Sequence, residues 1–195
     1  MDKARGNGMF DILEYDDAPE DVREIYDDIL KNLGNEGLVD YFKVLGKHNK
    51  NILGATWDLL KKVLIKGELP RSLKELVFVA VSNENNCRYC TDVHSAVCKM
   101  MHVDENTLQK VLDKAKDLNP KRVKVAIDFA IKMAINVSSI TSNDHQILMD
   151  VGLSKSEIFE LMSLVSVTNY SNTLAQGMMI AVDNNILTIL EREST

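Results

Sequence analysis

The sequence has few cysteines, no long apolar run and no excess of positive charge. Only three of its 195 residues are cysteines, and this small, odd number argues against a secreted scaffold held together by disulfides. No stretch approaches the roughly 20 apolar residues that a membrane-spanning helix needs. The formal net charge is −6, which argues against non-specific binding to nucleic acids or to anionic membranes.

Two structural signals are also missing: a strand-like alternation of apolar and polar residues, and a linker or low-complexity segment. The fold class predicted from these absences is all-α. We expect an irregular lead-in over residues 1–17 and a single domain over residues 18–195, which is long enough to bury a sizeable core. The first residues contain no apolar signal segment, so we expect a cytoplasmic protein.

Apolar residues recur at helical spacing along most of the chain. The run from Leu76 to Val81 is rich in valine, but its proline start and helical neighbours favour a helix over a strand. Further helices are predicted at the following places: from Pro19 to Gly34, over residues 39–45, from Asn49 to Gly67, from Asp104 through Ala115, from Pro120 through Met133, around residues 147–151, from a Ser154–Glu157 capping box, and from about Tyr170 to the C-terminus.

The stretch of greatest chemical interest runs from Glu75 to His94. It contains Cys87 and Cys90 in a Cys-x-x-Cys motif, and His94 follows four residues after the second thiol. Asn85 and Asn86 are good N-cap residues, so we expect a helix that begins at the cysteines. Helical spacing then places His94 one turn from Cys90, where its imidazole can accept the thiol proton. The pattern predicts a redox-active dithiol with its own base.

The cysteines also allow other interpretations. A structural zinc site needs four ligands, and only Cys98 and His102 lie farther along the same helix. Attachment of haem is excluded, because Thr91 and not histidine follows the motif. Two buried structural cysteines beside an unrelated histidine remain the main alternative. We expect neither a metal ion nor a cofactor, and we expect Cys98 to be a buried structural residue.

Two arguments from the sequence point in opposite directions on which of the two thiols reacts first. The dipole of the expected helix favours Cys87, which is nearer the helix start. The shared face with His94 favours Cys90, and we predict that Cys90 has the lower pKa and attacks first. Glu75 is a candidate catalytic residue. Its alternative role is structural, because a glutamate in the first turn of a helix can simply face solvent.

The pattern Glu-x11-Cys-x2-Cys-x3-His, together with the lead-in from Gly67 to Glu75 and the later segment from Gly152 to Ala175, resembles the alkylhydroperoxidase D-like proteins of the carboxymuconolactone decarboxylase superfamily. The resemblance covers roughly residues 20–185. It implies an all-α alkylhydroperoxidase D-like fold with the Cys-x-x-Cys at the start of a helix. It also implies that Glu75 and His94 relay a proton to activate Cys90, and that Cys87 completes a disulfide.

The function expected on this basis is a thiol-dependent peroxidase or disulfide oxidoreductase. Its partners would be a hydroperoxide substrate and an external dithiol or disulfide reductase, with no nucleic acid and no membrane. Tyr89 would line the approach to the thiols or simply pack. The resemblance and the apolar terminal helices favour a homo-oligomer. The alternatives are a redox-responsive or scaffold protein that does not turn over, and, less favoured, a decarboxylase-type enzyme.

The sequence also contains a weak internal similarity between the region of the motif and a later segment. The segment before Glu75 resembles the segment before Glu157, and Asn169-x-x-Asn172 occupies a place like that of Cys87-x-x-Cys90. This is either a degenerate helical repeat in which one copy holds the chemistry, or chance.

Overall fold

The computed structural model describes residues 9–114 and 117–191. Every regular element within these ranges is helical, so the all-α prediction is confirmed. The part of the predicted lead-in that is described, residues 9–17, contains turns and no helix. Residues 1–8 of that lead-in, Ala115 of the predicted helix after Asp104, and residues 192–195 lie outside the described ranges. Within the described residues, no helix is both long and apolar enough to cross a membrane.

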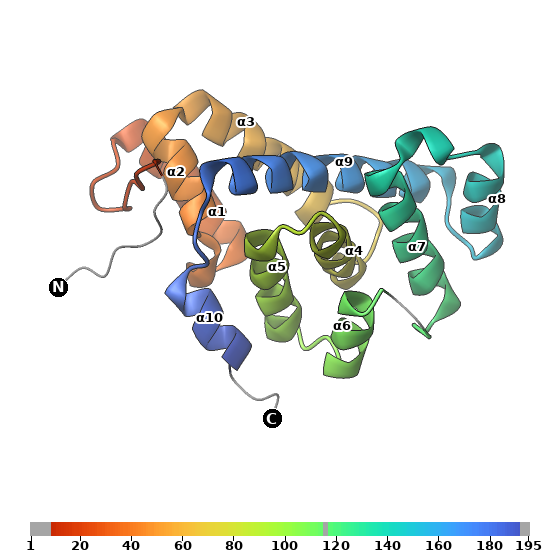
Figure 1. The fold of residues 1–195 in the computed structure, drawn as a ribbon. Helices are drawn as coiled ribbons and strands as arrows, with labels where there is room; N and C mark the ends of the chain where they lie inside the picture. Colours follow the sequence, from red (N-terminus) through yellow and green to blue (C-terminus); the bar gives the residue numbers. More distant parts are fainter. Residues whose placement is uncertain (1–8, 115–116, 192–195) are drawn as a thin grey trace.

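The helical elements follow one another with short connections (Figure 1). They are α1 (Glu20–Leu33), η1 (Asn35–Gly37), α2 (Asp40–His48), α3 (Lys50–Leu60), η2 (Lys61–Ile65), α4 (Arg71–Glu84), α5 (Arg88–Met100), α6 (Glu105–Leu112), α7 (Lys121–Ile135), η3 (Val137–Ser139), α8 (Ser142–Asp150), α9 (Lys155–Met178) and α10 (Asn184–Glu191).

Helix α4 is the central element of the fold. It packs against α5, α7 and α9, and Figure 1 shows it beneath α9 with α5 beside it. All its residues from Leu73 to Ser82 are buried, as expected of a helix that is covered on every side. The valine-rich run is therefore a core helix, and a charged residue on it is taken out of water.

The turn between α4 and α5 differs from the prediction. Neither Asn85 nor Asn86 caps α5, because the N-cap is Cys87. Asn85 instead follows the last residue of α4, and Asn86 has a φ of 56°, a left-handed conformation that asparagine tolerates well. The chain uses these two residues to reverse direction between the helices. This leaves the Asn85 side chain free to donate hydrogen bonds to α9.

The C-terminal region also corrects the sequence-based expectation. One continuous helix, α9, runs through the predicted break near Tyr170, and its predicted capping box of Ser154 and Glu157 is present. The chain then turns at Met179, whose φ of 54° is left-handed. The expected last helix is thus divided, and only α10 forms its final part. Because α10 packs on α5, this break brings the C-terminal helix beside the cysteines.

The helix predicted from Asn49 to Gly67 is regular only as far as Leu60. It continues as the π-helix η2, an irregularity that often marks functional sites. The buried ammonium group of Lys74 accounts for its position, because it donates hydrogen bonds to the carbonyl groups of Val63 and Lys66 and pairs with Glu160. This anchoring fixes η2 against α4 and α9.

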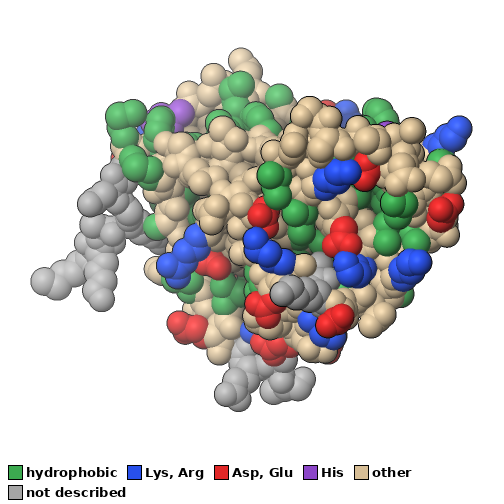
Figure 2. Space-filling view, turned by 45° about the vertical axis from the view of Figure 1, so that its right-hand side comes forward, with side chains coloured by type: hydrophobic (Ala, Val, Ile, Leu, Met, Phe, Trp, Pro, Cys, Tyr) green, Lys and Arg blue, Asp and Glu red, His purple; other side chains and the backbone are tan. Residues whose placement is uncertain are grey.

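The surface has no dominant charge on the face shown in Figure 2. Basic and acidic side chains are interspersed there, with apolar side chains between them. A face of this kind offers no extended field of one sign to a polyanion.

Candidate active site

Both predicted reactive thiols are buried at the start of α5. Cys87 is the N-cap and Cys90 lies in the first turn. Their exposed fractions are 0% and 5%, and both are free thiols. They differ in what they face, since Cys90 lines a cavity and Cys87 does not. A molecule that enters the cavity therefore meets Cys90 first.

The ionisation order of the two thiols is opposite to the prediction. The Cys90 thiol donates a hydrogen bond to the Cys87 sulfur, which lowers the pKa of Cys87 against the effect of burial, and the Cys90 backbone N–H adds to it. The same hydrogen bond, together with burial, raises the pKa of Cys90. The physical reason is the hydrogen bond between the sulfurs: the Cys87 sulfur accepts it and the Cys90 thiol donates it, so the first negative charge resides on Cys87.

Glu75 lies at the core of the site rather than in solvent. Its side chain is fully buried. Its Oε1 accepts a hydrogen bond of 2.6 Å from Arg71 Nε and forms an ion pair with Arg71 Nη2 at 2.5 Å. Burial by itself would raise the pKa of this carboxyl, but His94 and Arg71 outweigh burial and hold the pKa below its ordinary value. Glu75 is therefore a carboxylate at neutral pH.

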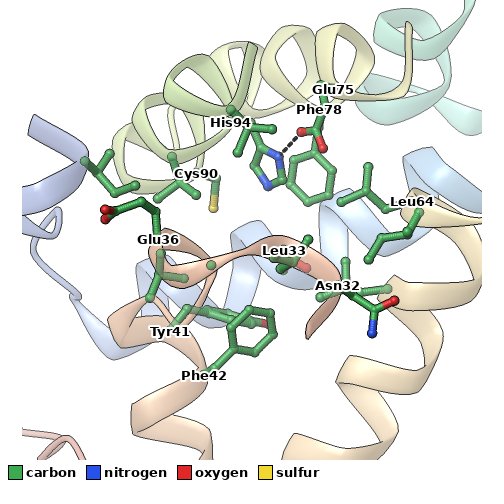
Figure 3. Close-up of a pocket in the computed structure, with 18 of the residues that line it drawn as sticks. Asn32, Leu33, Glu36, Tyr41, Phe42, Leu64, Glu75, Phe78, Cys90 and His94 are labelled. Atoms are coloured by element: carbon green, nitrogen blue, oxygen red, sulfur yellow. Dashed lines mark hydrogen bonds and ion pairs between the residues drawn. The ribbon is translucent and has the colours of Figure 1, made fainter. Parts of the chain in front are cut away.

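His94 is held by two neighbours from α4. Its Nδ1 lies 2.6 Å from Oε2 of Glu75, and its ring stacks on Phe78 with a centroid separation of 3.6 Å. Because Glu75 is ionised, the Nδ1–H group donates this hydrogen bond to the carboxylate, and Nε2 is the ring nitrogen that remains for another partner. Figure 3 shows the His94 ring between Glu75 and the Cys90 sulfur. The relay from Cys90 to His94 stays a prediction.

The cavity in front of Cys90 has a volume of about 320 Å³ and is mostly apolar. Its walls come from α1, η1, α2, α3, η2, α4, α5, α9 and α10, and they include Phe42, Trp57, Leu60, Leu64 and Ile186. Cys90 and His94 also line it. The cavity can accept a small ligand with an apolar body and hold it against the thiol.

Tyr89, between the cysteines, both lines the cavity and fixes its wall. Its hydroxyl donates a hydrogen bond of 3.0 Å to Asp183 Oδ2 and accepts one of 3.0 Å from the backbone N–H of Tyr41. The other oxygen of Asp183 accepts a hydrogen bond of 2.8 Å from the backbone N–H of Asp40. Tyr89 thereby connects the start of α2 to the segment between α9 and α10.

The buried carboxyl at this junction predicts a pH dependence of stability. Burial, followed by the charge of Asp40, raises the pKa of Asp183 to about 6 from an ordinary value of 3.8. The native protein thus keeps a proton that the unfolded chain loses between these values. Stability should fall as the pH rises through this window, with a slope of up to about 1.4 kcal/mol per pH unit from this group. Urea unfolding of the wild type and Asp183→Asn from pH 4 to pH 7 should show a flatter profile in the variant. Identical profiles would contradict the assignment.

Cys98 is fully buried, as predicted, and does not line the cavity. Burial raises its pKa, with a further contribution from the charge of Glu75. We expect Cys98→Ala to lower the free energy of unfolding by about 1 kcal/mol, because it leaves a small void, and to leave thiol oxidation unchanged. Unfolding curves and the rate of disulfide formation measure the two effects. A large loss of oxidation rate in a folded variant would show that this thiol takes part.

Several residues of the site were not identified from the sequence as parts of it. The Asn172 amide donates a hydrogen bond to Cys90 and another, of 2.9 Å, to Ser82. The Asn85 amide lies 2.8 Å from the side-chain oxygens of both Asn169 and Asn172. The internal similarity at Asn-x-x-Asn was the available signal, and its place in the fold is directly against the cysteine turn. Arg71 carried no signal of its own.

Comparisons with known proteins give independent evidence for the alkylhydroperoxidase D-like fold. Residues 51–119 match the model of the carboxymuconolactone decarboxylase family. No curated protein matches the chain. Among solved structures, the alkylhydroperoxidase AhpD core of an uncharacterized peroxidase-related protein from Ralstonia eutropha is 19% identical, with a TM-score of 0.83, covering 94% of this chain and 96% of that one.

Two other solved structures are similar. A peroxidase-related protein from a Silicibacter species is 19% identical with a TM-score of 0.81, covering 94% of this chain and 95% of that one. A cysteine-to-alanine variant of the debrominase Bmp8, in complex with 2,3,4-tribromopyrrole, is 18% identical with a TM-score of 0.81, covering 96% of this chain and 98% of that one. The predicted resemblance to alkylhydroperoxidase D-like proteins is confirmed, and the fold is theirs.

Proposed function

From the alkylhydroperoxidase D-like fold and the dithiol that it encloses, we propose that the protein reduces hydroperoxides with Cys90 and Cys87 at the expense of an external dithiol. One observation carries the proposal. Cys90 lies on the wall of an apolar cavity, hydrogen-bonded to a second thiol, and the Glu75–His94 pair lies on the same wall. A buried structural cysteine pair needs neither the cavity nor the hydrogen-bonded pair of Glu75 and His94.

The reaction proceeds in balanced steps. The Cys90 thiolate attacks the distal oxygen of the hydroperoxide, the O–O bond breaks, and the sulfur becomes a sulfenic acid. The leaving alkoxide takes a proton and departs as the alcohol. The Cys87 thiol then attacks the sulfenic sulfur, which forms the disulfide and releases water. An external dithiol reduces the disulfide by exchange and is itself oxidised.

Access rather than acidity assigns the attack to Cys90. The dithiol as a whole loses one proton, and the charge rests first on Cys87. The hydrogen bond between the sulfurs lets the remaining proton move to Cys87, which turns Cys90 into the thiolate that faces the cavity. In this proposal, Nε2 of His94 accepts the first proton, and Glu75 stabilises the imidazolium that results.

The cavity determines which hydroperoxides are favoured. An apolar body gains free energy by leaving water for the apolar walls, whereas hydrogen peroxide gains nothing from them. We therefore expect a lower KM for cumene hydroperoxide than for hydrogen peroxide. The identity of the physiological substrate is not needed for this comparison.

Turnover tests the proposal against the alternative of a redox-responsive protein that does not turn over. The purified protein is supplied with cumene hydroperoxide and dithiothreitol, and formation of 2-phenyl-2-propanol is followed. A catalyst forms many equivalents of the alcohol per protein. Formation of a single equivalent, followed by arrest in excess reductant, would contradict a peroxidase and favour the sensor.

Reductive debromination is a second candidate, favoured by the apolar cavity and by the likeness to Bmp8. Here the Cys90 thiolate would attack bromine, the carbon would take a proton, and Cys87 would displace bromide to form the same disulfide. Release of bromide from a tribromopyrrole in the presence of dithiothreitol tests this reaction under the same conditions.

A further inference from the structure

Two buried hydroxyl groups in the cavity have no hydrogen-bond partner. Tyr41 on α2 and Ser171 on α9 are each 5% exposed, and both line the cavity in front of Cys90. Neither hydroxyl oxygen has a partner among the described residues. A buried hydroxyl without a partner lowers the stability of a fold, so two of them in one cavity call for an explanation.

The fold places Tyr41, Ser171 and Cys90 on the walls of the same cavity. The backbone N–H of Tyr41 donates a hydrogen bond to the hydroxyl of Tyr89, the residue between the two cysteines in the sequence. Ser171 precedes Asn172, whose amide is bonded to Cys90. Figure 3 shows Tyr41 across the cavity from Cys90 and His94. The two groups thus add polar atoms to a cavity whose lining is mostly apolar.

We infer that the hydroxyls of Tyr41 and Ser171 bind the oxygen atom through which a substrate is anchored at Cys90. Under the function proposed above, on which this assignment rests, that atom is the proximal oxygen of the hydroperoxide, the one that leaves as alkoxide. The ligand class is a small molecule with an apolar body and one hydroperoxide or hydroxyl group.

The chemistry of the leaving group accounts for the two donors. When the O–O bond breaks, negative charge develops on the proximal oxygen until a proton reaches it. Donors that are already in place inside an apolar cavity stabilise such a charge far more than water does. Burial keeps the pKa of Tyr41 above its ordinary value, so its hydroxyl stays protonated as a donor. The final proton comes from the imidazolium of His94.

A structural role for the pair makes a different prediction. Ser171 lowers the pKa of Tyr41 as a hydrogen-bonding neighbour does, so a hydrogen bond between the two hydroxyls is the competing arrangement. If such a bond stabilises the fold, Tyr41→Phe and Ser171→Ala will each lower the midpoint of thermal unfolding. If the hydroxyls await a ligand, removing them will leave that midpoint unchanged or raise it. Tyr26→Phe is the matched control, because the buried Tyr26 hydroxyl donates to the Leu13 carbonyl at 3.1 Å outside the cavity.

A binding experiment tests the inference without any turnover. The full chain carrying Cys90→Ala is titrated with 2-phenyl-2-propanol and with tert-butylbenzene, in which a methyl group replaces the hydroxyl. We expect the alcohol to bind roughly tenfold more tightly than the hydrocarbon. The preference should disappear when Tyr41→Phe and Ser171→Ala are added. An equal preference with and without the two hydroxyls would overturn the inference.

Kinetics provides the second test. In Tyr41→Phe and in Ser171→Ala, kcat/KM for cumene hydroperoxide should fall at least tenfold, while alkylation of the thiols by iodoacetamide, which has no leaving oxygen, should keep its rate. Tyr26→Phe should keep both rates. A parallel loss of both reactions would mean that the hydroxyls act on the thiolate and not on the leaving oxygen, which contradicts the assignment.

The two tests separate the inference from the proposed function. If the wild type does not turn over hydroperoxides, the proposed function fails, and the binding experiment still decides the role of the hydroxyls. If the wild type turns over and the variants match it in kinetics and binding, only the inference fails.

Discussion

Cys90→Ser is expected to lower peroxide turnover by about a thousandfold or more, because a serine hydroxyl cannot replace the thiolate that attacks the O–O bond. Cys87→Ser should also abolish turnover, but for another reason. It retains the attacking thiol and loses the one that forms the disulfide, so oxidation should stop at a sulfenic acid on Cys90. The two serine variants are therefore matched controls for each other.

Trapping of the sulfenic acid, with assignment by mass, in each single-cysteine variant from pH 5 to pH 9 measures the difference. In the structure the lower pKa belongs to Cys87. Acidity therefore predicts attack by Cys87, whereas access to the cavity predicts attack by Cys90. If access governs attack, the adduct forms on Cys90 in Cys87→Ser and much more slowly on Cys87 in Cys90→Ser. Equal rates would show that Cys87 reaches the peroxide, and the acidity of the N-cap thiol would then assign the nucleophile.

His94→Ala should lower the rate of thiol oxidation near neutral pH by about a hundredfold, within the range usual for loss of a general base. Without the imidazole, the thiol proton must pass to solvent hydroxide, so the rate should recover as the pH rises. The rate profile is thus expected to move to higher pH. His48→Ala is the control, since His48 is exposed and contacts Phe10 outside the cavity.

Glu75→Gln should move the profile in the same direction by a smaller amount. The amide keeps the shape of the side chain but cannot stabilise the positive charge that His94 gains on accepting a proton. Rates of oxidation by cumene hydroperoxide from pH 5 to pH 9 measure both shifts. Profiles of His94→Ala and the wild type that coincide would show that the proton leaves the dithiol by another route.

Local patterns were sufficient for the elements that carry the site. The proline and the apolar run after it predict α4, and the helical stripes predict α5 with Cys90 and His94 on neighbouring turns. These signals work because they depend on contacts within a few residues of one another. The same reasoning misplaced the cap of α5, since asparagine is a good N-cap in isolation but here completes the reversal between two packed helices.

The C-terminal break shows a second limit of local reasoning. Gly177 lies just before the break, but the residue that adopts the left-handed conformation is Met179, which lacks a glycine's freedom. The break is maintained by contacts distant in sequence, among them the hydrogen bonds from Tyr89 and the Asp40 backbone to Asp183. Tertiary contacts of this kind have no local signature.

The sequence by itself determined the all-α class and the spacing of Glu75, Cys87, Cys90 and His94 on two adjacent helices, because helical periodicity and motif spacing are properties of short segments. The tertiary structure decided the rest. Packing of α5 on α4 buries Glu75 and joins it to His94, and the hydrogen bond from the Cys90 thiol gives Cys87 the lower pKa. The cavity, with its two unpartnered hydroxyls, is assembled from helices far apart in the chain, and burial and charge there depend on every element that closes around the thiols.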